Sequence, residues 1–158
     1  MTGTRSTEDT TRDFDEFFAS LRKHAVKFLI VGAYAVAFHA KPRYTKDIDV
    51  FVAPDRENAR NLVIALEEFG FAEAALKTED FVEAGRIVQL GFPPSRIDLL
   101  TSIDGVNFAE AWEGKAEGHY GSTAVWYIGR AELIRNKRAS GRPQDLLDLE
   151  WLETDAPS

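Results

Sequence analysis

The sequence of 158 residues contains no cysteine, so it can form neither a disulfide nor a metal site built on thiolates. It has no apolar run near the roughly 18 residues that cross a bilayer, and its polar first residues lack the apolar core of a signal peptide. These absences predict a cytoplasmic protein that does not bind membranes.

Positive charge is scarce as well. The sequence has 19 lysines and arginines against 26 aspartates and glutamates, which gives a formal net charge of −7. This balance argues against a broad surface for nucleic acids or other polyanions. It does not exclude a local basic pocket for one triphosphate, particularly one screened by magnesium.

The length and composition predict one domain. A chain of this size, with 44% hydrophobic residues, buries about 70% of its unfolded surface. Residues 1–12 are rich in threonine, serine and charge, which predicts a disordered N-terminal tail. The remaining residues, 13–154, form the predicted domain.

Between residues 28 and 52 the pattern predicts a strand, a tight turn, a short helix, a loop and a second strand. The apolar run Phe28–Val31 stops at Gly32, and an alanine-rich segment continues to Ala40 before a proline. A helix that begins at Gly32 points unpaired backbone N–H groups at an anion, which is the usual arrangement for holding phosphate.

Two aspartates, Asp47 and Asp49, lie in the second apolar run. Because side chains alternate along a strand, both belong to one face, whereas Ile48 and Val50 belong to the other. Partly buried like charges repel each other unless something compensates them, and a divalent cation is the obvious compensator. The sequence therefore predicts a metal site at this pair.

A third carboxylate lies in a further predicted strand. The segments Arg86–Leu90 and Arg96–Leu100 read as two strands joined by a proline-containing turn, and the second contains Asp98. An ion pair with Arg96 or Arg86 is nearly as good an explanation of Asp98 as metal binding. If Asp98 is a ligand, its strand must neighbour that of the aspartate pair, with the three carboxylates within about 4–6 Å of one another.

The other elements complete the predicted fold class, which is α/β (α+β). We expect a small mixed, mostly antiparallel sheet with helices packed mainly on one side. Further helices are predicted near residues 14–21, 55–69, 107–112, 133–138 and 143–152, and a further strand at 123–128. The segment 71–85 is ambiguous, with a helix favoured around 79–83.

Gly32, the run Thr45–Asp49 and the apolar residues around both resemble the signature of the nucleotidyltransferase superfamily, which includes the DNA polymerase beta-like enzymes. The segment PRYTKDIDVFV is most similar to the small bacterial branch called AbiEii-toxin-like or nucleotidyltransferase-like. The resemblance extends from about Val26 to Leu152. One departure is Ala33, where the family usually has glycine or serine, so a serine hydroxyl is lost while the backbone N–H remains.

The resemblance implies a metal-dependent enzyme that transfers a nucleoside monophosphate from an NTP to an acceptor and releases pyrophosphate. It implies two Mg²⁺ (or Mn²⁺) ions per site, both bridged by Asp47 and Asp49. Asp98 would bind the catalytic ion and orient or deprotonate the acceptor. Gly32 and Ala33 would donate backbone N–H groups to the β- and γ-phosphates.

Four further residues complete the predicted nucleotide-binding set: Thr45, Lys46, Lys137 and Arg142. Lys137 and Arg142 are candidates for phosphate or acceptor contacts, and their alternative is a solvated charged face. Lys46 points away from the aspartate face if its strand is regular.

The acceptor stays open among tRNA, a protein side chain and a small molecule. An alternative from another class is a catalytically degenerate module that binds nucleotide or takes part in a toxin–antitoxin pair, with a cognate antitoxin or a second copy as partner. Ala33 favours this alternative, whereas the full set of three carboxylates opposes it. A metal-dependent phosphohydrolase is a third possibility.

Overall fold

The computed structural model describes residues 7–42, 45, 47–92 and 95–154. Its helices are α1 (Thr7–Lys23), α2 (Gly32–His39), α3 (Arg56–Leu66), α4 (Phe108–Glu113), α5 (Arg130–Ser140) and α6 (Pro143–Thr154). Its strands are β1 (Phe28–Val31), β2 (Asp47–Val52), β3 (Ile87–Leu90), β4 (Arg96–Leu100), β5 (Ala116–Tyr120) and β6 (Thr123–Tyr127). A π-helical turn (Glu67–Phe71) and two 3-10 turns (Ala72–Ala74 and Thr78–Phe81) follow α3.

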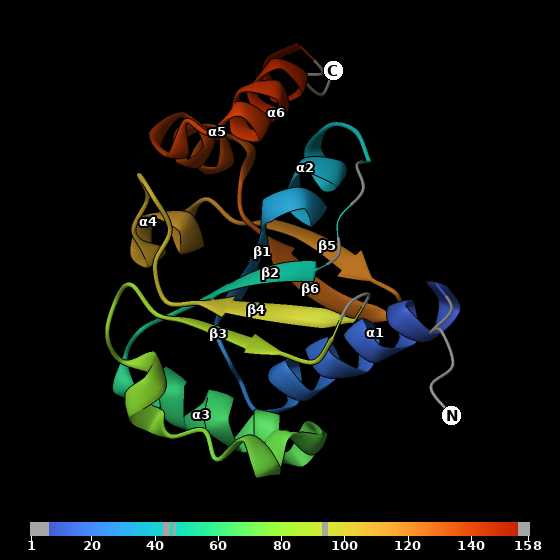
Figure 1. Cartoon of the computed structure of the whole chain (residues 1–158), viewed down its shortest axis with the longest axis vertical. Helices are drawn as coiled ribbons and strands as arrows, with labels where there is room; N and C mark the ends of the chain where they lie inside the picture. The colour runs from blue at the N-terminus through green and yellow to red at the C-terminus, as the bar shows by residue number, and fades with distance from the viewer. Residues whose placement is uncertain (1–6, 43–44, 46, 93–94, 155–158) are drawn as a thin grey trace.

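The strands form one six-stranded sheet in the order β3-β4-β2-β1-β6-β5 (Figure 1). Strand β1 is antiparallel to β2 and parallel to β6, and β2 is parallel to β4. The outer pairs β3–β4 and β5–β6 are antiparallel hairpins. This arrangement confirms the predicted mixed, mostly antiparallel sheet. In Figure 1, α1 and α3 lie below the sheet, whereas α2, α5 and α6 lie above it.

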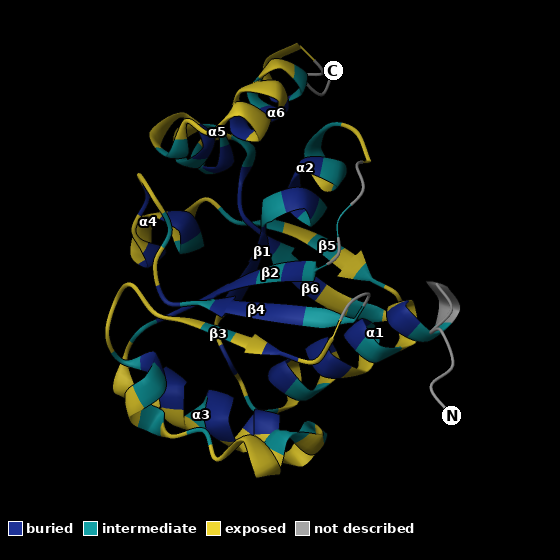
Figure 2. Ribbon diagram, viewed as in Figure 1, coloured by how far each residue is buried: buried dark blue, intermediate teal, exposed yellow. Residues whose placement is uncertain are grey.

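The core forms where the apolar face of α1 meets the sheet. Phe14, Phe17, Phe18 and Leu21 recur with the period of a helix, and all four side chains are completely buried. The ring of Phe18 stacks on that of Phe28 in β1, with the centroids 5.4 Å apart. Figure 2 shows the resulting pattern, in which the buried residues of α1 and α3 turn towards buried central strands. This packing fixes the sheet whose strand ends carry the site.

Helix α1 begins earlier than the composition of the N-terminus predicted. Residues 7–12, expected to belong to a disordered tail, form its first turns, while residues 1–6 lie outside the described part of the chain. Thr10 is buried, and its hydroxyl lies 3.4 Å from that of Ser95. A polar segment gains order here through a tertiary contact, and composition alone cannot reveal that contact.

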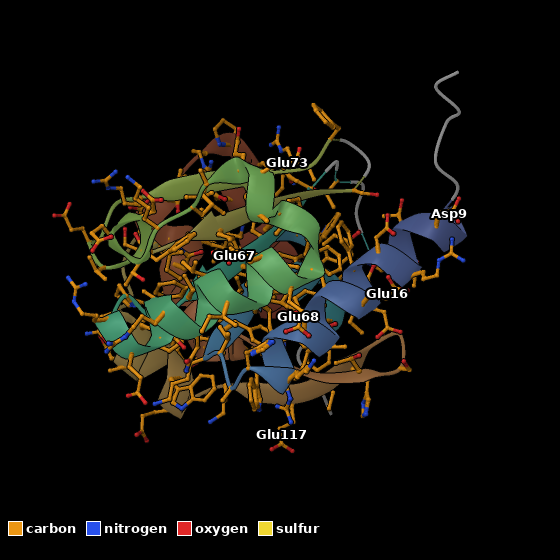
Figure 3. The ribbon with its side chains drawn as sticks, turned by 90° about the horizontal axis from the view of Figure 1, so that it is seen from below. Asp9, Glu16, Glu67, Glu68, Glu73 and Glu117 are labelled. Carbon is orange, nitrogen blue, oxygen red and sulfur yellow. The ribbon has the colours of Figure 1, made fainter. Side chains whose placement is uncertain are left out.

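Acidic side chains gather on the side of the molecule that Figure 3 presents. Asp9 and Glu16 project from α1, Glu67, Glu68 and Glu73 follow α3, and Glu117 lies on β5. This view is from below Figure 1, so the group faces away from α5 and α6. Within the described residues, no helix is long and apolar enough to cross a membrane.

Candidate functional site

Three carboxylates meet where β2 and β4 begin. The parallel register of these strands places Asp98 opposite Asp49, and the antiparallel register of β1 places Val31 opposite Asp49 on the other side. One carboxylate oxygen from each of Asp47, Asp49 and Asp98 lies within 4.8 Å of the other two. The structure thus confirms that the two aspartate-bearing strands are neighbours and that the carboxylates converge.

The turn at Gly32 is built against this cluster. Gly32 has φ of +65°, in the left-handed region, and a Cβ atom there would overlap the carboxylate of Asp49. Helix α2 starts at this residue, and no side chain caps its first N–H groups. The predicted anion-binding turn and the carboxylates are therefore immediate neighbours.

Asp49 is the carboxylate with the least compensation. Among the described residues, none donates a hydrogen bond to its side chain or forms an ion pair with it. Burial raises the pKa of Asp49 to about 6, and the charges of Asp47 and Asp98 contribute in the same direction. The folded chain thus holds this carboxylate against electrostatic repulsion.

Asp47 and Asp98 share an arginine that the sequence analysis considered only as a rival explanation. Arg96 donates a hydrogen bond to Asp47, and its Nε lies 3.2 Å from Asp98 Oδ1. Thr45 donates its hydroxyl proton to Asp47 Oδ1 at 3.1 Å. Arg86, the other proposed partner of Asp98, pairs with Glu83 instead. Asp98 therefore belongs both to the cluster and to an ion pair.

The residues of the cluster fit a hard divalent cation. Asp98 is only 8% exposed, and its buried Oδ1 accepts no hydrogen bond from any described residue. Burial and the charge of Asp47 raise the pKa of Asp98, while Arg96 opposes that shift. Three carboxylates with an unsatisfied buried oxygen form the type of oxygen donor set that Mg²⁺ or Mn²⁺ prefers.

Lys137 lines the same cleft, but its charge is already engaged. Its Nζ lies 3.1 Å from both Asp145 Oδ1 and Asp148 Oδ2, and the residue is 4% exposed. The solvated charged face weighed for Lys137 is therefore wrong. Arg142 donates from Nε to Asp145 Oδ2 at 2.9 Å, and its side chain is 75% exposed. Of these two predicted phosphate ligands, only Arg142 presents its charge to solvent.

A cleft of about 770 Å³ joins these parts. On one side of the cluster it is lined by Gly32, Ala33 and Thr45, three of the predicted nucleotide-binding residues. On the other side it extends over β4 and β3 to the loop after β4 and to the facing ends of α5 and α6. Lys46 lies outside the described residues.

This fold has counterparts among solved structures. The crystal structure of ANT(2'')-Ia in complex with adenylyl-2''-tobramycin has a TM-score of 0.58 at 16% identity, with 94% of this chain and 89% of that chain covered. The solution structure of the same antibiotic-resistance factor has a TM-score of 0.60 at 15% identity, with coverages of 94% and 85%.

A lincosamide adenylyltransferase has a similar fold. The crystal structure of lincomycin-bound LnuA has a TM-score of 0.53 at 12% identity, with 92% of this chain and 97% of that chain covered. No protein-family model matches the chain, and no curated protein matches it in sequence. At these identities the likeness establishes the shared fold, and the activity has to be argued from the site.

Proposed function

We propose that the protein is a metal-dependent nucleotidyltransferase that transfers a nucleoside monophosphate from an NTP to a small-molecule acceptor. The observation that carries the proposal is the convergence of Asp47, Asp49 and Asp98 beside the Gly32 turn within one cleft. The titles of the similar structures name an adenylylated aminoglycoside and a bound lincosamide, which supports a small acceptor of comparable size.

The carboxylates would hold Mg²⁺ or Mn²⁺, two ions per site. When bound, such ions neutralise charge on the triphosphate and favour ionisation of the acceptor hydroxyl. The first N–H groups of α2, at Gly32 and Ala33, donate hydrogen bonds to the phosphates. Thr45 keeps the carboxylate of Asp47 in place through its hydroxyl.

Asp98 is the residue best placed to accept the proton of the acceptor. Burial and the charge of Asp47 raise the pKa of Asp98, which makes its carboxylate a stronger base than an ordinary aspartate. The acceptor oxygen forms a bond to the α-phosphorus, and pyrophosphate departs with the electrons of the broken P–O bond. The proton released from the acceptor goes to the carboxylate of Asp98.

The acceptor half of the cleft lies beyond Asp98, over β4 and β3. Its lining combines apolar and polar side chains: Ile87, Leu100, Ile103, Gln89, Asp104 and Asn136. Such a lining suits a compact molecule with an apolar face and hydroxyl or amino groups. The acidic character of the chain disfavours tRNA in this half.

Transfer of label from each α-³²P-labelled NTP tests the proposal. Wild-type protein with a small-molecule fraction of a cell extract should produce a labelled adduct and pyrophosphate in Mg²⁺, and Asp49→Asn should produce neither. Release of inorganic phosphate alone would instead identify a phosphohydrolase. Nucleotide binding without any product would favour the degenerate module, with a cognate antitoxin or a second copy as its partner.

Ala33 and the engagement of Lys137 by two carboxylates are the features that favour that degenerate module. Titration calorimetry with a non-hydrolysable NTP analogue measures the nucleotide binding that both candidates share. Turnover of the labelled NTP then separates them, because it belongs only to the enzyme. A location in the cytoplasm belongs to either candidate and remains a prediction.

A further inference from the structure

Arg96 occupies a particular place in the cluster. It lies opposite Asp47 in the parallel register of β2 and β4, and it precedes Asp98 by two residues on the same face of β4. Its Nη2 donates to Asp47 and lies 3.4 Å from Asp98 Oδ2, while its Nε faces Asp98 Oδ1. One guanidinium group therefore bridges two of the three candidate metal ligands.

No other described cation is within ion-pair distance of these carboxylates. The nearby Lys137 forms its ion pairs with Asp145 and Asp148, and its charge acts on Asp49 only from beyond contact distance. Three neighbouring carboxylates repel one another strongly at this burial. In the chain without metal, Arg96 is the described residue that offsets this repulsion by direct contact.

Arg96 contacts Asp98 through two of its guanidinium nitrogens. Nη2 donates a long hydrogen bond of 3.4 Å to Asp98 Oδ2. Nε and Oδ1 are 3.2 Å apart and form an ion pair, yet both atoms are buried and neither has a hydrogen-bond partner among the described residues. The Arg96 side chain is 31% exposed, so its guanidinium reaches solvent without crossing the core. Charge and one long hydrogen bond therefore hold Arg96 beside Asp98.

From these contacts we propose that Arg96 is the internal counter-ion of the cluster, and that it gives up Asp47 and Asp98 when a divalent cation binds them. The inference rests on the proposed metal centre. Binding is then an exchange of one cation for another, so Arg96 weakens the apparent metal affinity while it stabilises the metal-free fold. The alternative is that Arg96 stays in place and orients the ligands. Loss of Arg96 would then weaken metal binding, whereas the counter-ion role predicts that its loss strengthens it.

The substitution Arg96→Gln measures both effects. In EDTA the variant should melt roughly 3–6 °C below wild type, since the cluster loses the cation that contacts it among the described residues. In calorimetric titrations with MgCl₂ and MnCl₂ it should bind metal roughly tenfold more tightly, because no cation has to be displaced. Arg86→Gln is the matched control, since it removes the same charge from an exposed pair with Glu83 and should change neither value.

Arg96→Lys provides a second variant in case the glutamine variant does not fold. Lysine keeps the charge but cannot contact two carboxylates through a planar fork, so its metal affinity should lie between those of wild type and the glutamine variant. Weaker metal binding by both variants, or unchanged melting in EDTA, would overturn the counter-ion role. Absence of metal binding by wild type would overturn the metal centre and the exchange together, and the melts in EDTA would still decide whether Arg96 offsets the cluster.

Discussion

Asp49 holds its carboxylate in a position that is unfavourable for the stability of the metal-free fold. Its carboxylate lies between two others at the ends of the strands, and Gly32 lacks the Cβ atom that would collide with it. Burial without a hydrogen-bond donor raises its pKa to about 6. A buried carboxylate with a raised pKa and no hydrogen-bond donor is typical of a site that functions with a bound cation. Without the cation, the repulsion between the carboxylates destabilises the fold.

Asp49→Asn should therefore stabilise the metal-free protein. The folded chain keeps the Asp49 proton up to about pH 6, whereas the ordinary value is 3.8, so ionisation costs wild-type stability as the pH rises from about 4 to 6. Asparagine does not titrate, and the variant should gain up to about 3 kcal/mol over wild type above pH 6 in EDTA. Urea unfolding at pH 4 and pH 7.5 measures this difference.

Added Mg²⁺ should reverse the order of stability of wild type and Asp49→Asn. A ligand that binds only the folded state stabilises it by about 2.7 kcal/mol at a hundredfold excess over Kd, so wild type should gain and Asp49→Asn should gain little. A variant less stable than wild type in EDTA, together with no magnesium effect on wild type, would make Asp49 a structural residue.

At the scale of elements, α5 and α6 are joined by a buried charge network. Lys137 on α5 pairs with Asp145 and Asp148 on α6, and all three residues are less than 5% exposed. Gly141 adopts φ of +62° between the helices, and Pro143 opens α6 as the sequence predicted. This pair closes the cleft on the side opposite the sheet (Figure 1).

Lys137→Met should destabilise the protein by about 3–5 kcal/mol, because it removes the buried cation that Asp145 and Asp148 share and leaves Asp145 only its pair with the exposed Arg142. Arg138→Met is the control on the same helix, since Arg138 pairs with Glu153 of α6 in solvent and its loss should cost at most about 1 kcal/mol. Urea unfolding of both variants measures the contrast. Equal effects would mean that the buried network contributes no more than a surface pair.

The elements that could be predicted from the sequence are those with a local signal. The strand–turn–helix–strand segment around Gly32, the helix at Phe14 and the helix pair at Pro143 follow from periodicity, glycine and proline. Strand β5 has a weak signal, because its residues alternate only between half-buried and exposed. It also contains Gly118, where the rings of Phe38 and Tyr127 leave no space for a Cβ atom.

The site was predictable only in part for the same reason. Asp47 and Asp49 share a strand, so their common face can be read locally, and Asp98 was predicted from its apolar surroundings. The bridging role of Arg96 depends on the parallel register of β2 with β4, and the burial of Lys137 depends on the packing of α5 against α6. Neither arrangement leaves a pattern in neighbouring residues.

For the whole molecule, acidic side chains lie on the surface behind the cleft as well as in its lining. The chain carries a formal charge of −7, and the acidic group of Figure 3 faces away from α5 and α6. A polyanion that approaches the molecule meets a repulsive field over that surface, whereas a small acceptor only has to enter the cleft. This charge distribution favours a small acceptor over a large polyanion such as tRNA.

The protein should accordingly show no retention of tRNA. Affinity for a polyanion depends on phosphates neutralised by lysine and arginine, and this chain has 19 of these residues against 26 aspartates and glutamates. Electrophoretic mobility shifts at 50 mM salt should show no complex at micromolar protein. A complex that weakens steeply with added salt would restore tRNA as a candidate acceptor.

The pairing of β2 with β4 also determines the stage of folding at which the site forms. Asp47 and Arg96 are 49 residues apart in sequence, and α3 and three irregular turns lie between their strands. Closing so long a loop is a slow, entropically costly step, and the carboxylates converge only after it. A nascent or partly folded chain consequently lacks the complete cluster, so capture of a divalent cation at the proposed metal centre would report that folding has been completed.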